Sequence, residues 1–147
     1  MLYSTLSITL ESDVVFSVDS LSRQPIYEQI IQQLERFVLT GVVKPGEQLP
    51  TVRGLSIQLS INPNTIQKAY SELDRRGIIC SVPGRGCFVS ENAVLLLSEN
   101  RRQELGTLKR LIYEFAIAGI EQQIVIETVN KAYDDYNSDS EGSAVND

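Results

Sequence analysis

The sequence predicts a mainly α-helical fold with one small β-hairpin, and three features carry this prediction. Apolar residues recur at intervals of three and four over most of the chain after residue 25, as on the buried face of amphipathic helices. Capping residues, prolines and glycines stand where these stretches begin and end. Two short β-type runs flank Pro83-Gly84-Arg85-Gly86, a combination typical of a hairpin. We therefore expect an N-terminal domain of three helices and a hairpin, followed by a short helical hairpin.

Composition narrows the possible functions before any motif is considered. The 147 residues include two cysteines and no histidine. Ser-His-Asp and Cys-His nucleophile systems are therefore absent, and two cysteines cannot complete a four-thiolate zinc site. No Walker-type or dinucleotide-binding glycine pattern occurs. We expect a protein that is not an enzyme and that holds no cofactor or metal.

The chain also lacks the marks of secretion and of membrane insertion. Its N-terminus shows no signal-peptide pattern, and two cysteines fit a reducing compartment. No apolar run approaches the roughly 20 residues of a membrane span. A cytoplasmic protein with no membrane partner is expected.

Charge is distributed unevenly along the chain, although the net charge of −6 is unfavourable for a nucleic-acid partner. Residues 1–20 hold three acids and no Lys or Arg, and residues 91–147 hold eleven acids and five basic residues. Residues 21–90 hold eight basic residues and five acids, so this segment alone is net positive. Such asymmetry indicates a DNA-contacting part joined to an acidic partner part, unless it is chance variation over short segments.

Residues 1–20 form an N-terminal extension or strand, because apolar residues alternate weakly there, and we do not expect order in the first dozen. A first helix follows over about 25–40. Pro25 suits its first turn, and Gly41 suits a left-handed cap at its end. Its buried stripe is Ile26, Ile30, Leu34, Phe37 and Val38, with the polar residues, Gln29 and Glu35 among them, on the remaining faces.

Two shorter helices with a tight turn between them come next. Thr51 is a natural N-cap for the first of them, and Asn62 followed by Pro63 begins the second after a turn at Ser60-Ile61. The inward residues are Val52, Leu55 and Leu59 on one helix and Ile66, Ala69, Tyr70 and Leu73 on the other. Gly77 ends the second helix.

The hairpin that follows is expected to turn at Gly84-Arg85. This register pairs Val82 with Cys87 and places Cys80 opposite Val89, so the two cysteines are not directly opposed and a disulfide is not expected. Two small buried apolar side chains are the main interpretation, and a redox switch is the alternative.

Residues 21–90 together form a winged helix-turn-helix domain, a device that places side chains in a DNA groove. Asn, Thr and Gln side chains at the start of the second short helix can read base edges. The glycines of the hairpin allow a close backbone approach, and Arg85 can enter a minor groove or meet a phosphate. The alternatives are an ordinary solvated helix face and a plain surface hairpin.

Residues Pro25 to Val89 resemble the winged-helix domain of the GntR family of bacterial transcription regulators, and the short helical region after them resembles the YtrA-type subfamily. The resemblance rests on these motifs: Pro25-Ile26-Tyr27, Pro45-Gly46 to Leu49-Pro50, Val52-Arg53, the INPNT run at 61–65, Ala69-Tyr70 and Gly84-Arg85-Gly86. It implies that Arg53 meets the DNA backbone or a base, that Asn64, Thr65 and Gln67 contact DNA from the recognition helix, and that Gly84 does so from the wing. Gly54 departs from the family, which usually has glutamate there, and Pro63 and Gln67 replace arginines of other subfamilies. The complete candidate set for DNA binding is Arg53, Asn62, Asn64, Thr65, Gln67, Lys68, Gly84 and Arg85.

The C-terminal region is predicted to form two helices, about 92–118 and 121–136, within a dimerisation region at 91–136. Their apolar stripes are too wide for one thin hairpin and favour burial against a second copy. The candidate dimerisation residues are Leu105, Leu108, Ile112, Phe115, Val125 and Val129. Folding back onto the winged domain is the alternative. Residues 137–147 are small and acidic and are expected to be a disordered tail.

These features favour a homodimeric, sequence-specific transcription regulator, most readily a repressor, that binds a palindromic double-stranded DNA operator. The resemblance implies control of a neighbouring transporter operon as a family tendency. A winged-helix module that binds protein instead of DNA is the alternative function. The region after the wing is too short for the aminotransferase domain that some members of the wider family carry, while a small-molecule effector at the dimer seam stays open.

Overall fold

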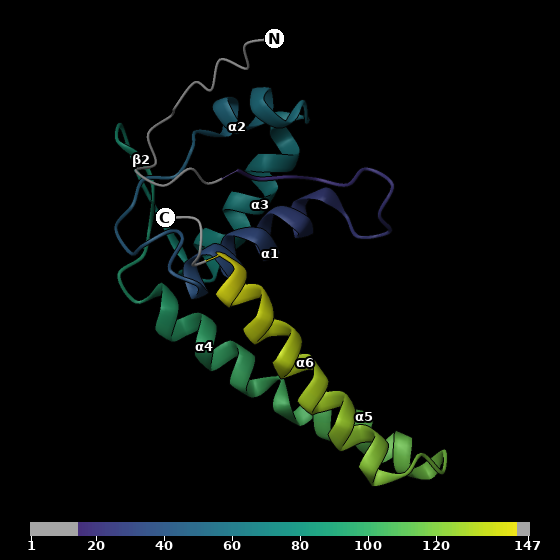
Figure 1. The fold of residues 1–147 in the computed structure, drawn as a ribbon. Helices are drawn as coiled ribbons and strands as arrows, with labels where there is room; N and C mark the ends of the chain where they lie inside the picture. Colours follow the sequence, from purple (N-terminus) through teal and green to yellow (C-terminus); the bar gives the residue numbers. More distant parts are fainter. Residues whose placement is uncertain (1–14, 144–147) are drawn as a thin grey trace. The chain divides into compact units, whose positions relative to one another are not determined.

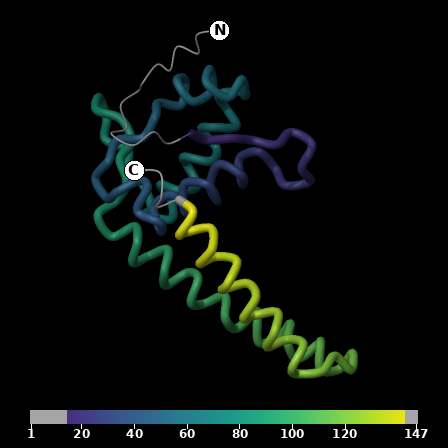
Figure 2. Tube along the Cα trace, in the orientation of Figure 1, coloured from purple at the N-terminus to yellow at the C-terminus, as the bar shows by residue number. Residues whose placement is uncertain are grey.

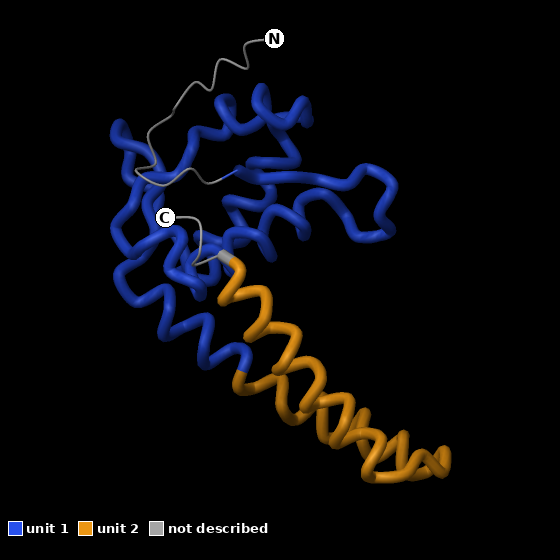
Figure 3. The backbone as a smooth tube through the Cα atoms, viewed as in Figure 1, with its two compact units in different colours: residues 1–101 blue, residues 102–147 orange. Residues whose placement is uncertain are grey.

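Six helices and one two-stranded antiparallel sheet occur in residues 15–143, the part of the chain that the computed structural model describes. Their bounds are α1 Ile26–Leu39, α2 Val52–Leu59, α3 Pro63–Arg75, β1 Ile79–Val82, β2 Gly86–Val89, α4 Ala93–Gln103, α5 Leu105–Ile117 and α6 Gln122–Ser143. The chain divides into two units, residues 1–101 and 102–147, and the boundary falls within α4 (Figure 3). Each unit is described by itself below.

Helix α3 is the centre of the first unit, where it contacts α1, α2 and β1 (Figure 1). All four of its predicted inward residues are buried: Ile66, Ala69, Tyr70 and Leu73. The same core includes Ile30, Leu34 and Val38 of α1 and Leu55 of α2. Burial of large aliphatic side chains like these contributes roughly 1.5–3 kcal/mol each. The predicted winged helix-turn-helix arrangement is therefore present, with a mostly helical architecture and one small sheet.

The register of the hairpin differs from the predicted one by one residue. Val82 pairs with Gly86, and Ser81 pairs with Cys87. The difference arises because Pro83 and Gly84 occupy the two central positions of a turn, in which the Arg85 amide donates to the Val82 carbonyl at 3.0 Å. Gly84 has φ +76°, the positive value that the second central position of a proline-led turn requires.

This register corrects the expected burial of the cysteines. Cys80 lies opposite Phe88 and is exposed, while Cys87 is half-buried with its sulfur 3.3 Å from the Ser81 hydroxyl. The two cysteines are on opposite faces of the hairpin, since successive residues of a strand alternate between faces. Both are free thiols.

Strand β2 is paired along both of its edges. On the edge away from β1 it meets residues 46–49, where the Leu49 amide donates to the Cys87 carbonyl at 2.8 Å and the Val89 amide donates to the Glu47 carbonyl at 2.9 Å. Gln48 forms a bridge with Phe88 there. The wing is therefore built onto the segment that leads into α2.

Residues 15–24 run along α1 and then turn back into its start (Figure 2). Three α1 residues spaced four apart hold this segment. Gln29 exchanges two hydrogen bonds of 2.9 Å with the Asp19 backbone. Gln33 also exchanges two hydrogen bonds with the Ser17 backbone. Phe37 meets the buried Phe16 ring edge to face at 5.4 Å. Gln29 is thus buried, contrary to the expected exposed position, and residues 1–14 of the predicted extension lie outside the described residues.

Glu35 is the second polar residue of α1 that is buried instead of exposed, with 8% of its surface accessible. Its carboxylate accepts from Arg76, at the end of α3, at 3.1 Å, and from Arg101 of α4 at 3.4 Å. Ala93 and Leu97 of α4 are also buried in the core of the first unit. The core of this unit therefore extends beyond residue 90, the end of the predicted domain.

The second unit contains α5 and α6. The predicted single helix over 92–118 is instead two helices, α4 and α5, which are separated at Glu104. Helix α6 continues to Ser143, so residues 137–143 are helical and not the start of a disordered tail. The Ser138 hydroxyl donates to the Asp134 carbonyl at 2.9 Å, which lets a small polar residue remain in the helix without competing for its amides.

Candidate nucleic-acid interface

Side-chain caps fix the starts of α2 and α3. The Thr51 hydroxyl accepts from the Gly54 amide at 2.9 Å, and the Asn62 side-chain oxygen accepts from the Asn64 amide at 2.9 Å. Ser60 lies between the helices at φ +54°, a left-handed conformation that costs a non-glycine residue of order 1–3 kcal/mol. Its neighbour Ile61 accepts from the buried Ser56 hydroxyl at 2.5 Å. The caps predicted from the sequence are thus confirmed.

The outer face of α3 carries the predicted reading residues. Asn64, Gln67 and Lys68 are exposed and Thr65 is half-buried. The Gln67 amide donates to the Ser71 hydroxyl at 3.1 Å, one turn further along the same face. This face presents donors and acceptors beside the N-terminus of α3, where the positive end of the helix dipole favours a phosphate.

Lys68 has a partner that the sequence did not indicate. Its ammonium nitrogen lies 3.8 Å from the centroid of the Tyr27 ring on α1, which is a cation–π contact. The Tyr27 hydroxyl donates to the Glu28 carboxylate at 3.0 Å, and this hydrogen bond is the main reason why the pKa of Tyr27 is raised. Lys68 therefore links α3 to α1, and a ring covers only one side of its ammonium group.

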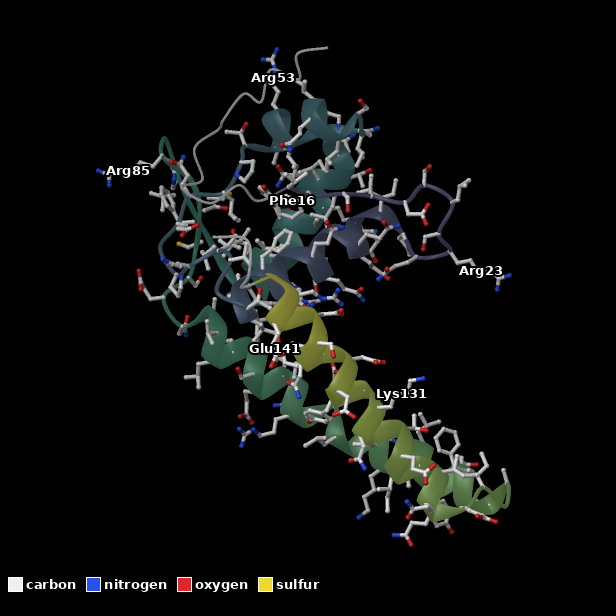
Figure 4. All side chains as sticks on the ribbon, viewed as in Figure 1. Phe16, Arg23, Arg53, Arg85, Lys131 and Glu141 are labelled. Atoms are coloured by element: carbon white, nitrogen blue, oxygen red, sulfur yellow. The ribbon has the colours of Figure 1, made fainter. Side chains whose placement is uncertain are left out.

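Two arginines project from the elements that precede and follow α3 in the chain. Arg53 extends outward from the first turn of α2, and Arg85 extends outward from the wing tip (Figure 4). Neither guanidinium has a hydrogen-bond or ion-pair partner among residues 15–143. Guanidinium groups bind phosphate bidentately, so both are available for a nucleic-acid backbone.

Arginines at the other end of α3 are neutralised. Glu72 accepts from Arg75 and from Arg76, each at 2.7 Å. These hydrogen bonds, that of Arg75 first, lower the pKa of Glu72 to about 2, and the same bond raises the pKa of Arg75. Arg76 and Arg101 also share Glu35, so these three arginines are held in ion pairs, whereas Arg53 and Arg85 have no such pair among residues 15–143.

One short segment, residues 48–51, connects all three parts of the candidate interface. The buried Tyr70 hydroxyl of α3 donates to the Pro50 carbonyl at 2.7 Å. Leu49 pairs with β2 of the wing, and Thr51 caps α2. Burial raises the pKa of Tyr70, so its hydroxyl stays protonated and remains a donor. The sequence predicted Thr51 as the cap of α2, but it did not indicate the contacts that Gln48, Leu49 and Pro50 make.

The predicted site residues fall into two groups in the structure. Arg53, the α3 residues and the wing residues all belong to the first unit, and all except the half-buried Thr65 are exposed. Asn62 acts there as a helix cap, because its side-chain oxygen is used by Asn64. Sequence reasoning missed Gln48, Pro50 and Tyr70 as supports of this region, since their partners are distant in the chain. Pro50 and Tyr70 both belong to motifs identified in the sequence, but the sequence does not show that the two residues are in contact.

The predicted dimerisation residues form the second group, in the second unit. Phe115 and Val125 are half-buried, while the other four are exposed: Leu105 (58%), Leu108 (44%), Ile112 (36%) and Val129 (41%). No residue of α5 is buried. An apolar stripe of this size is left open to solvent in the single chain.

Residues 15–143 contain no group of three or more Cys, Asp or Glu side chains that could hold a metal ion. Within the same residues, no helix has the length and apolar character needed to cross a membrane.

Comparisons with known proteins agree with this geometry. The family model described as "Bacterial regulatory proteins, gntR family" matches residues 26–89. The HTH-type transcriptional repressor YtrA of Bacillus subtilis is 41% identical over 134 residues, which are 90% of this chain and 100% of that protein. The HTH-type transcriptional regulator YhcF of the same organism is 32% identical over 108 residues, 74% of this chain and 89% of that protein.

Solved structures show the same fold. A GntR family transcriptional regulator from Listeria monocytogenes superposes with a TM-score of 0.63 and 33% identity, covering 78% of this chain and 98% of that one. YtrA from Sulfolobus acidocaldarius, a GntR-family transcription factor, has a TM-score of 0.55 and 31% identity, with 71% and 99% covered.

Replacing Tyr70 by Phe tests the link between α3 and the segment before α2. The substitution leaves the Pro50 carbonyl in a buried setting without its donor, so we expect the free energy of unfolding to fall by about 1–2 kcal/mol. Urea denaturation monitored by circular dichroism measures the change. Tyr133→Phe removes the same hydroxyl from an exposed residue of α6 and should change stability by less than about 0.5 kcal/mol. Equal stabilities of the Tyr70 and Tyr133 variants would contradict the assigned role.

Proposed function

The chain belongs to the gntR family of bacterial regulatory proteins, winged-helix regulators that bind DNA, and we propose that it is a homodimeric transcriptional repressor of a palindromic operator. The observation that carries the proposal is the exposed polar face of α3, with an unpaired arginine on the element that precedes it and another on the element that follows it. The phosphate oxygens of a nucleic-acid backbone bind such guanidinium groups directly.

In this proposal the N-terminal part of α3 enters the major groove. Asn64, Thr65 and Gln67 read base edges there, because their amide and hydroxyl groups both donate and accept. Asn62 holds the helix start and brings its backbone toward a phosphate. Lys68 approaches the backbone with the side of its ammonium group that the Tyr27 ring does not cover.

Helix α2 and the wing, which flank α3, fix the position of the domain along the duplex. Arg53 contacts a phosphate at one border of the groove. The wing contacts the other border, where Gly84 allows a close backbone approach and Arg85 meets a phosphate or enters the minor groove. Nothing lies within 4 Å of the position that a Cβ of Gly84 would occupy, so the approach to its backbone is open.

Dimerisation is proposed to occur through the apolar stripe of α5 and α6. Two copies would bury side chains that the single chain leaves exposed, and a two-fold axis would match two inverted half-sites. The half-site spacing then follows from the dimer, because each copy places one α3 in the major groove.

The regulatory role is proposed from similarity. The Bacillus subtilis relative that aligns over its whole length is named a repressor, and we extend that role to this chain. Control of a neighbouring transporter operon follows from the same resemblance, and action in the cytoplasm follows from a DNA target. We propose no catalytic function, and a small-molecule effector, if present, would act at the dimer seam.

The function is tested with DNA that the protein itself selects from random double-stranded sequences. We expect enrichment of one pattern with two inverted half-sites. Arg53→Ala should weaken binding to this operator, and the slope of log K against log salt should become shallower by about 0.9, since one phosphate contact is lost. Titrations at several salt concentrations give both quantities.

Arg23→Ala is the matched control, because Arg23 lies in the loop before α1 and points away from the candidate interface (Figure 4). It should leave the salt slope unchanged. A failure to enrich any sequence, or the same slope change in both variants, would contradict the proposed interface and would favour a protein-binding module.

A second prediction concerns the dimer. Ile112→Glu places a charge in the proposed seam, where an unpaired buried ion costs several kcal/mol. The protein should sediment as a monomer and bind the operator on the order of 10²–10⁴ times more weakly, because the second half-site contact is no longer tethered. Circular dichroism should show that the winged domain remains folded.

Ile117→Glu makes the same exchange at a residue about 140° further around α5, outside the predicted stripe. This control should stay dimeric. A folded Ile112→Glu variant that sediments as a dimer and binds normally would exclude the stripe as the dimer interface.

A further inference from the structure

Gln48 joins the wing tip to the segment before α2. Its side-chain amide donates to the Arg85 carbonyl at 2.9 Å, across 37 positions of sequence. Gln48 also forms the bridge with Phe88 of β2, so its backbone is already fixed next to the wing. The side chain is therefore held at its base by the sheet and at its end by the turn.

Gly86 is shaped to receive this side chain. It has φ +118°, and a Cβ built on it would lie 2.8 Å from the Gln48 amide nitrogen. A residue with a side chain at position 86 would thus displace Gln48 in addition to straining the backbone. Position 86 immediately follows Arg85, so the same contact supports the backbone on both sides of the Arg85 carbonyl.

The hydrogen bond between Gln48 and Arg85 lies at the surface, so its role is to orient the turn and not to satisfy a buried polar group. Gln48 and Arg85 are both exposed, and water could replace either partner. The turn has only local support at its apex, since the Arg85 amide bonds to Val82 inside the turn itself. Gln48 instead ties the turn to residues that continue through Pro50 to Thr51, the cap of α2.

We propose that Gln48 is a positioning residue for DNA binding, which holds the Arg85 backbone so that the guanidinium group meets the duplex. This inference rests on the proposed function, because it assigns Gln48 an effect only through the wing contact. Gln48 also connects that contact to the start of α2, so Arg53 and Arg85 are both positioned from residues 48–51.

A double-mutant cycle on the selected operator tests the inference. Gln48→Ala should weaken binding about three- to tenfold, the range for one hydrogen bond of modest net strength. In an Arg85→Ala background, the same change should weaken binding less than about twofold, because the group that it positions is gone. Gln48→Met keeps the length of the side chain but has no N–H donor, and it should behave like Gln48→Ala.

Gln32→Ala, at an exposed glutamine of α1, is the matched control and should bind normally. Equal losses from Gln48→Ala in both backgrounds would overturn the inference, because Gln48 would then act without Arg85. Normal binding by Gln48→Ala while Arg85→Ala binds weakly would overturn this inference alone. Normal binding by Arg85→Ala would overturn the wing contact in the proposed function and this inference with it.

Discussion

The hydrogen bond from the Tyr70 hydroxyl to the Pro50 carbonyl is the constraint on which the candidate interface depends. Tyr70 belongs to α3, and Pro50 belongs to the segment that pairs with the wing and leads into α2. Because proline restricts the residue before it to extended conformations, Leu49 is directed into pairing with β2. The recognition helix, the start of α2 and the wing are thus placed from one buried point, and their exposed side chains can contact one duplex together.

Ion pairs also affect the charge of the candidate interface. Glu35 and Glu72 hold Arg75, Arg76 and Arg101 away from the interface, at the C-terminal end of α3 and on α4. The acidic residues therefore pair with these three arginines and leave Arg53 and Arg85 without an ion pair among residues 15–143. This explains how a chain with a net charge of −6 can present a surface suited to DNA.

Local signals allowed much of the fold to be predicted. The caps at Thr51 and Asn62 and the proline at position 63 gave the bounds of α2 and α3, because they act within one turn of helix. The hairpin register was wrong, since it depended on whether Pro83 belongs to a strand or to the turn. Gln29 and Glu35 were placed on exposed faces because their partners, Asp19 and Arg76, come from other parts of the chain. Gln48 was missed for the same reason.

Native-state hydrogen exchange tests most directly whether the segment 48–51 makes the interface one cooperative unit. The informative amides are those of Leu49 and Val89, which join this segment to the wing, and of Leu55, in the first turn of α2. The account predicts that their opening free energies agree within about 1 kcal/mol. Exchange of Leu49 and Val89 at free energies several kcal/mol below that of Leu55 would contradict it, because the wing would then open independently of the helices.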